Sequence, residues 1–114
     1  MSGSEGENNN RRHFRIHYPS YERPIFTFKD KIFYITDLSE SGMNLVVDED
    51  FTLVESQKIS GSIDFNGRGQ ADVKGIIRRV QGKKIAVEFR VGVPLNMIMV
   101  EQRFLMQQAN LEAE

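Results

Sequence analysis

The sequence predicts an all-β domain, an antiparallel barrel or sandwich of six strands, followed by a C-terminal helix. Three observations support this prediction. Six short segments are rich in β-branched and aromatic residues and mostly alternate between apolar and polar side chains. Turn-forming residues separate these segments, and the links are too short for the crossovers that parallel strands need. After Pro94, the apolar residues take on a mainly helical spacing.

The expected strands cover residues 24–28, 31–36, 43–47, 58–65, 71–80 and 84–91. Two of the links between expected strands have sequences typical of β-hairpin turns. The string "FNGRG" contains Asn66-Gly67, a pair that tolerates the positive φ of a tight turn, and "VQGKKI" offers a second such turn at Gly82. In the helical segment, Met97, Met99 and Met106 are expected to pack on a barrel mouth rather than to form a partner-binding face.

Composition narrows the possible functions. A chain of 114 residues with 39% hydrophobic and 27% charged residues is typical of one soluble domain. The net charge of −1 provides no global basic field for coating nucleic acid, so any recognition of anions must be local. The absence of cysteine excludes disulfides and zinc–sulfur sites. No apolar run could span a membrane and residues 1–10 contain no secretory core, so we expect a cytoplasmic protein.

Signatures of catalysis and of metal binding are weak. His13 and His17 are four residues apart, but Pro19 argues against a helix that presents both, and there is no third spaced histidine. Ser39 and Ser41 lack the G-x-S-x-G context of an activated serine. The sequence therefore predicts a protein that is not an enzyme and holds no metal, with both histidines acting as spacers.

Two polar motifs remain. The first is "RRHFR", with Arg11 and Arg15 four residues apart; taken alone, it is most simply a solvated basic tail. The second is "TDLSESG", residues 36–42, where Asp37 and Ser39 are two apart at the end of an expected strand and so should project to the same face. Gly42 would permit a positive φ or a close approach by a ligand. Taken alone, this second motif is a plain turn.

Together and in this order, the motifs R-x-x-x-R and D-x-S-x-x-G, followed by β-hairpins, resemble the PilZ domain family over residues 11 to about 91. The resemblance implies a six-stranded antiparallel barrel with a helix after the last strand, and a bacterial receptor for the second messenger cyclic di-GMP. We therefore expect a leader (1–10) whose polar composition predicts disorder, a barrel domain with a ligand-binding arm (11–93) and a helix that packs on the barrel (94–114).

The resemblance also implies roles for individual residues. Arg11 and Arg15 would contact the phosphates and guanines of the ligand, and Asp37 and Ser39 would contact a base. Gly42 would keep the backbone close and unobstructed. These roles agree with the chemistry of the ligand, because guanine presents acceptors on one edge that suit arginine and N–H donors on another that suit a carboxylate.

Two further arginines are candidates. Arg12 could supply another phosphate or stacking contact. Some family members carry an aromatic residue on the fifth strand against guanine; here the segment "GIIRRV" places Arg78 or Arg79 in that region. A guanidinium can stack on a base, so Arg79 is a candidate contact, although an ordinary exposed strand arginine is the slightly favoured alternative.

The leading hypothesis is a receptor whose arm, residues 1–17, is mobile when free and orders over cyclic di-GMP, forming a surface for a downstream protein partner. It requires no cofactor other than this ligand, and no DNA or RNA. An alternative is a ligand-independent PilZ-like adaptor that acts through protein contacts. A third hypothesis is a small barrel that binds single-stranded nucleic acid, against which the pI of about 6.1 counts. The sequence leaves two properties open: whether one or two ligands bind each domain, and whether the protein is a monomer or a homodimer.

Overall fold

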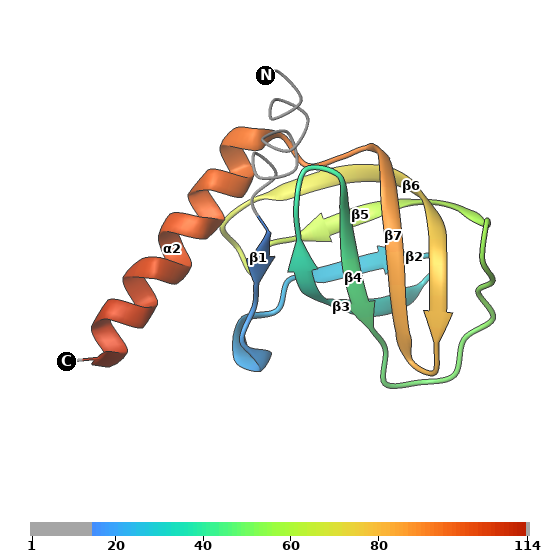
Figure 1. Ribbon diagram of the computed structural model, residues 1–114, viewed down its shortest axis with the longest axis horizontal. Coiled ribbons are helices and arrows are strands. Elements are labelled where there is room, and N and C mark those ends of the chain that lie inside the picture. The colour runs from blue at the N-terminus through green and yellow to red at the C-terminus, as the bar shows by residue number, and fades with distance from the viewer. Residues whose placement is uncertain (1–14, 114) are drawn as a thin grey trace, which may run out of the picture.

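The computed structural model describes residues 15–113, which form seven strands, a short 3-10 turn and one long helix (Figure 1). The elements are β1 (Ile16–His17), η1 (Ser20–Glu22), β2 (Ile25–Phe28), β3 (Lys31–Leu38), β4 (Gly42–Val46), β5 (Lys58–Asp64), β6 (Gln70–Gln81), β7 (Lys84–Val91) and α2 (Leu95–Ala113). All six strands expected from the sequence are present, close to their expected ends. The short strand β1 was not expected.

Six of the strands close into an antiparallel barrel. The order β3-β2-β5-β6-β7-β4 returns to its start because β4 also pairs with β3. This closure confirms the barrel and leaves the six strands without an unpaired edge. Strand β1 adds to β3 beyond the end of β2, so it continues the line of β2 along the same edge. Pro19 and Pro24 lie between these two strands, and each lacks the N–H that a continuous ladder would need.

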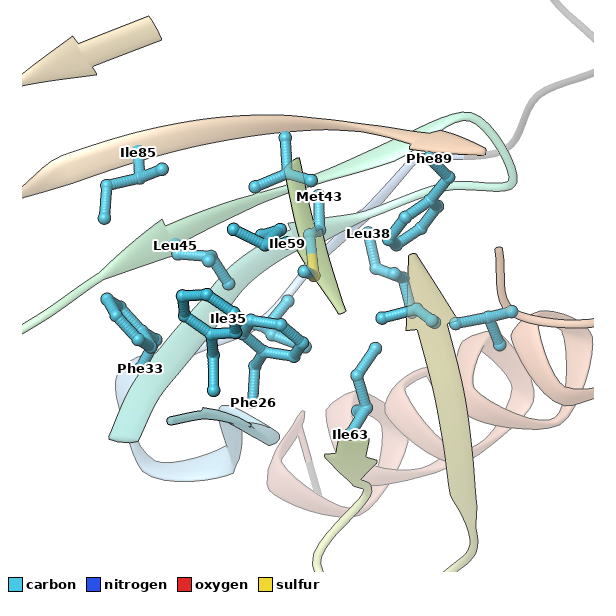
Figure 2. Packing of buried hydrophobic residues seen from close by; sticks show 14 of the residues in the cluster. Phe26, Phe33, Ile35, Leu38, Met43, Leu45, Ile59, Ile63, Ile85 and Phe89 are labelled. Carbon is cyan, nitrogen blue, oxygen red and sulfur yellow. The ribbon is translucent and has the colours of Figure 1, made fainter. Parts of the chain in front are cut away.

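The inward-facing residues of the strands fill the barrel. Figure 2 shows how phenylalanines and branched aliphatic side chains from opposite walls meet in its interior. Phe26 and Phe33 lie with their ring centroids 6.1 Å apart, a favourable separation for tilted aromatic rings. Burying each such side chain stabilises the fold by roughly 1.5–3 kcal/mol. The most deeply buried apolar residues are Phe26, Phe33, Ile35, Leu38, Met43, Leu45, Ile63, Phe65, Ile77, Ile85 and Ile98.

Helix α2 begins directly after Pro94, whose carbonyl oxygen accepts the backbone N–H groups of Met97 (3.0 Å) and Ile98 (3.2 Å). Ile98 is fully buried and Met97 packs against the core, whereas Met99 and Met106 are 41% and 61% exposed. The expectation that the methionines pack together on the barrel is therefore wrong for Met99 and Met106. These two share one face of the helix, seven residues apart, and Met97 projects from nearly the opposite face. Within the described chain, no helix is both long and apolar enough to cross a membrane.

A buried carboxylate joins the helix to the barrel. Glu101 on α2 is only 2% exposed and accepts hydrogen bonds from the hydroxyl of Tyr18 (2.8 Å) and from Nε and Nη2 of Arg68 (2.8 and 2.9 Å). Arg68 belongs to the β5–β6 hairpin and also lies over the ring of Phe104 and 3.5 Å from the carboxylate of Glu22. Burial, and then the bond to Glu101, raise the pKa of Tyr18 well above its usual value. This cluster therefore joins three segments of the chain: residues 18–22, the β5–β6 hairpin and α2.

Candidate ligand-binding site

The two sequence motifs meet where β1 pairs with the last two residues of β3. In this register His17 lies opposite Asp37. Arg15 directly precedes β1 and is exposed. Arg11 and Arg12 lie outside the described residues. The structure therefore brings the C-terminal end of the arginine motif to the strand that carries the aspartate.

Asp37 is held outward by an irregularity in its strand. The register of β3 against β4 shifts between Ile35 and Asp37, which turns the carboxylate away from the barrel interior. Asp37 accepts hydrogen bonds from Thr36 Oγ1 (3.0 Å) and Asn44 Nδ2 (3.2 Å), and its other oxygen pairs with Nδ1 of His17. The expectation that His17 is only a spacer is therefore wrong.

These contacts set the charge of the site. Partial desolvation alone would raise the pKa of Asp37, but the hydrogen bonds from Asn44 and Thr36, together with His17, outweigh it and lower that pKa below its usual value. Asp37 is consequently an anion at neutral pH, with its carboxylate orientation fixed from three sides. About 18% of its side chain stays exposed.

A cavity of about 460 Å³ opens beside this carboxylate on the outer face of the barrel, and we call it the Asp37 cavity. Its floor follows the strand register, which places Asp37, Asn44, Ala86 and Arg79 side by side on four neighbouring strands. Ala86 in the middle of this row has a small side chain, which leaves space between its larger neighbours. The Asp37 cavity thus separates an anion at one end from an arginine at the other.

Three cationic residues line the Asp37 cavity: Arg23, Arg79 and Lys84. The Nε atom of Arg23 is buried and has no hydrogen-bond partner, the one such side-chain atom among the residues that the structure describes. A buried donor without a partner costs about 1–3 kcal/mol, so the side chain would gain from a new acceptor. With one carboxylate and three cations, the Asp37 cavity favours an anionic ligand that also carries N–H donors.

A second cavity of about 330 Å³ adjoins the first, and we call it the Arg15 cavity. Asn44 and Ala86 line both cavities, so the two share a wall or rim. The Arg15 cavity is otherwise lined by Arg15, Ser41, Gly42, Met43, Arg78, Val87 and Glu88. The exposed arginine of the first motif and the turn of the second motif therefore face the same depression.

The turn after Asp37 is held by its serines. Ser39 is 1% exposed; its hydroxyl lies 3.1 Å from that of Ser41 and accepts the Ser41 backbone N–H at 3.3 Å. Gly42 does not have a positive φ. A Cβ there would instead clash with the carbonyl oxygen of Val87 on β7. The geometry thus gives Ser39 and Gly42 structural tasks: Ser39 fixes the turn, and Gly42 lets β4 approach β7.

Arg78 and Arg79 face different cavities because of a bulge in β6. Ile77 pairs with Val87 and Arg79 pairs with Ala86, so Arg78 is the additional residue between them. Arg79 lines the Asp37 cavity, whereas Arg78 lines the Arg15 cavity and pairs with Glu88. The bond from Arg78 is also the largest cause that lowers the pKa of Glu88.

Comparison with known proteins now identifies the family. The sequence matches the PilZ domain over residues 9–107. The chain belongs to the PilZ domain family. A search of curated proteins finds no match. The structure resembles a PilZ domain of YcgR from Escherichia coli with c-di-GMP, with a TM-score of 0.70 and 20% identity over 88% of this chain and 97% of the other.

Two longer proteins have similar folds. They are YcgR from Escherichia coli in complex with c-di-GMP (TM-score 0.62, 21% identity) and the MrkH–c-di-GMP complex of K. pneumonia (TM-score 0.63, 13% identity). Each match covers 90% of this chain but only 49% and 54%, respectively, of the other. At these identities the likeness establishes a shared fold.

Several residues of this PilZ barrel would not have been selected from the sequence. Asn44 lies at an outward position of an expected strand, so alternation could have placed it beside Asp37. Lys84 begins a strand, and nothing else in the sequence marks it as a residue of the site. Arg23 precedes Pro24 in a segment expected only to be extended, and nothing in the sequence indicates that its side chain lines the Asp37 cavity.

Proposed function

We propose that this chain is a receptor for cyclic di-GMP, which binds on the outer face of the barrel across the Asp37 and Arg15 cavities. The observation that carries the proposal is an outward carboxylate, Asp37, that lines one cavity together with Arg79, while Arg15 lines the adjoining cavity. Three solved structures with the same fold contain this ligand. The proposed role is binding and signalling, and it requires no reaction.

The two ends of the Asp37 cavity suit the two edges of guanine. The carboxylate of Asp37 would accept the N–H donors of the Watson–Crick edge. An arginine fork would donate to O6 and N7 on the opposite edge, and Arg79 or Arg15 is placed for this role. A bidentate arginine contact of this kind is worth roughly 1–3 kcal/mol of discrimination between bases.

The phosphates of the ligand require cations, and the cavities supply them. The ligand carries two negative charges, and Arg23, Arg79 and Lys84 line the cavity around the single carboxylate. Arg15 lines the adjoining cavity. Charge-assisted hydrogen bonds to such groups contribute about 1.5–3 kcal/mol each. We assign Ser39 and Gly42 an indirect role at the site. They hold the turn after Asp37, and this turn sets the position of Ser41 at the rim of the Arg15 cavity.

The arm completes the proposal. Arg11 and Arg12 precede Arg15 in the sequence, and we assign them to close over the bound ligand, with the ordered arm as the signal to a downstream partner. Ordering each residue costs about 1–2 kcal/mol, which opposes the charge-assisted contacts. An affinity near micromolar, about −8 kcal/mol, is the expected balance and suits a reversible signal.

Isothermal titration calorimetry with cyclic di-GMP tests the proposal. The wild type should bind, and Arg15→Ala and Asp37→Ala should each weaken binding by at least about tenfold, or 1.4 kcal/mol. Arg103→Ala, an exposed arginine on α2, is the matched control and should bind like the wild type. Absence of heat with the wild type, or equally tight binding of GMP, would contradict the receptor function.

A second candidate function is a ligand-independent adaptor. It is favoured by the exposed apolar residues Leu95, Met99 and Met106, which lie along one face of α2. A protein partner whose capture requires these three residues and is unaffected by cyclic di-GMP, Arg15→Ala or Asp37→Ala would favour the adaptor over the receptor.

A further inference from the structure

A third depression lies over β5, β6 and β7, and its lining residues are different from those assigned above to the nucleotide. Its volume is about 520 Å³, and we call it the β5–β7 groove. Three of its lining residues are cationic: Lys58, Lys74 and Arg90. Ile59, Ser60, Gly75 and Ile76 complete the lining, which therefore contains no carboxylate. None of these residues lines the Asp37 or Arg15 cavity.

Strand register brings the three cations together. Lys58 and Ser60 lie on the same face of β5, and Ser60 pairs with Lys74 of β6. Lys74 pairs with Val91, and the next residue of β6 pairs with Phe89, so Arg90 is the additional residue of a bulge in β7. Bulges redirect side chains, and here the bulge turns Arg90 toward the groove. Because neighbouring strands lie about 4.8 Å apart, the three cations project from one compact area.

The charges of the β5–β7 groove are only partly neutralised. Lys58 and Lys74 are exposed, and neither has an ion-pair partner among residues 15–113. Arg90 donates a hydrogen bond to Glu88 at 3.1 Å, and Glu88 also holds Arg78. Like charges this close repel each other, so an anionic partner is favoured there although the whole chain has a net charge of −1.

This local charge reflects a segregation along the chain. Residues 58–91 contain eight Lys or Arg and three Asp or Glu, whereas residues 30–57 contain one Lys and seven Asp or Glu. The segment that forms β5, β6 and β7 is therefore basic, whereas the segment from the β2–β3 turn to the loop before β5 is acidic. Electrostatic complementarity of this kind steers association and fixes orientation more than it adds affinity.

We propose that the β5–β7 groove binds an acidic segment of a partner protein. Carboxylates spaced along an extended segment match cations that project from three adjacent strands. No aromatic side chain lines the groove, so it lacks the aromatic stacking surface that proteins binding single-stranded nucleic acid use. Ile59 is buried and Ile76 partly buried, so no large apolar side chain projects from the groove into a bilayer. The proposal goes beyond the nucleotide site and does not depend on it.

The test uses the full chain and a fluorescein-labelled peptide of alternating Glu and Ser, measured by fluorescence anisotropy at low salt. Lys58→Glu/Lys74→Glu should weaken binding by at least about tenfold. Lys83→Glu/Arg103→Glu changes the net charge equally but touches residues outside the groove, and should change binding by less than about twofold. The same peptide with Gln in place of Glu should not bind. Matching unfolding curves would establish that both double variants fold, and Lys58→Gln/Lys74→Gln replaces the first if it does not.

Amide chemical shifts locate the contact. With the peptide, the expected changes fall on residues 58–60, 74–76 and 90. Equal loss of binding in both double variants would overturn the proposal, because it would show attraction to net charge alone. Tighter binding of single-stranded DNA or of anionic vesicles, lost with Lys58→Glu/Lys74→Glu, would also overturn it. So would concentration-dependent self-association that this variant abolishes, since the acidic residues 48–50 of a second copy would then be the occupant.

Discussion

Two carboxylates, Glu101 and Asp37, are both held by residues of the N-terminal segment but differ in what surrounds them. Glu101 is 2% exposed, and Tyr18 and Arg68 satisfy both of its oxygens. Asp37 is held by His17, Thr36 and Asn44, yet 18% of its side chain is exposed at the edge of a cavity. A carboxylate enclosed by its partners stabilises the fold, whereas one that also faces a cavity can exchange a partner for a ligand.

The same short segment serves both carboxylates because its side chains alternate. His17 is exposed and turns outward to Asp37, whereas Tyr18 is buried and turns inward to Glu101. A movement of residues 17–18 at the ligand site would therefore also shift Tyr18 and its hydrogen bond to Glu101 on α2. The difference between the two carboxylates can be tested by removing each in turn.

The largest effect is expected for Glu101→Ala, and it should be an effect on stability. The substitution leaves the hydroxyl of Tyr18 without its buried acceptor and leaves Arg68, 20% exposed, with Glu22 as its carboxylate partner. We therefore expect a loss of about 3 kcal/mol, the lower end of the cost of breaking a buried ion pair. Urea unfolding of the variant and of Arg103→Ala, an exposed position on the same helix, would measure this. A loss no larger than that of Arg103→Ala would contradict the structural role of Glu101.

Asp37→Asn should mainly weaken ligand binding and should have little effect on folding stability. The amide presents one acceptor oxygen and one NH2 donor in place of two acceptor oxygens, so it cannot pair with two adjacent N–H donors of guanine. Affinity for cyclic di-GMP should therefore fall by roughly 1.5–3 kcal/mol. The loss of folding stability should stay near 0–1 kcal/mol, because the partner His17 is 74% exposed. Calorimetry and urea unfolding of one preparation would give both values. A stability loss as large as that of Glu101→Ala would make Asp37 a structural residue instead.

The lowered pKa of Asp37 predicts a smaller, pH-dependent contribution to stability. Because the folded-state pKa lies below its usual value of 3.8, the unfolded chain binds more protons in this range and stability falls on acidification. The difference in unfolding free energy between the wild type and Asp37→Asn should be fully present above about pH 5 and shrink toward pH 3. Urea unfolding at several pH values measures it. A difference that is constant across this range would contradict the role assigned to the hydrogen bonds on Asp37.

The smallest effect is expected for Glu88→Gln, which should increase the affinity for cyclic di-GMP. Glu88 lines the Arg15 cavity and pairs with Arg78, so its charge competes with a ligand phosphate for that arginine. Neutralising this exposed carboxylate should tighten cyclic di-GMP binding by about two- to fivefold, as expected for surface charges. Calorimetry against Glu49→Gln, an exposed acid that lines neither cavity, is the matched comparison. Weaker binding of Glu88→Gln would show that Glu88 positions Arg78 for the ligand.

Most of the barrel could be predicted from the sequence because its signals are local. Asn66-Gly67 and Gly82 have positive φ in the two hairpin turns where they were expected, and Pro94 directly precedes the helix. Strand β1 could not be predicted, because it is two residues long and depends on pairing with residues of β3 that are 20 and 22 positions away in the sequence.

The residues of the candidate site could be predicted only where a sequence motif or the family resemblance marks them. Arg15, Asp37 and Arg79 do line adjoining cavities, and Arg79 was separable from Arg78 only through the β6 bulge. Arg23 reaches the Asp37 cavity because the segment before β2 folds back toward it. The sequence of this segment has no hydrophobic periodicity from which that path could be predicted. His17 contacts Asp37 through a β1–β3 register that no local pattern determines.

The most direct test of the central claim is an amide chemical-shift titration of the full chain with cyclic di-GMP. The receptor function predicts saturable shifts concentrated on residues 37–44, 78–79 and 84–86, which surround the Asp37 and Arg15 cavities. The same titration of Asp37→Asn should need a much higher ligand concentration while the spectrum of the free protein stays folded. No saturable shifts, or shifts confined to residues outside these two cavities, would contradict the claim.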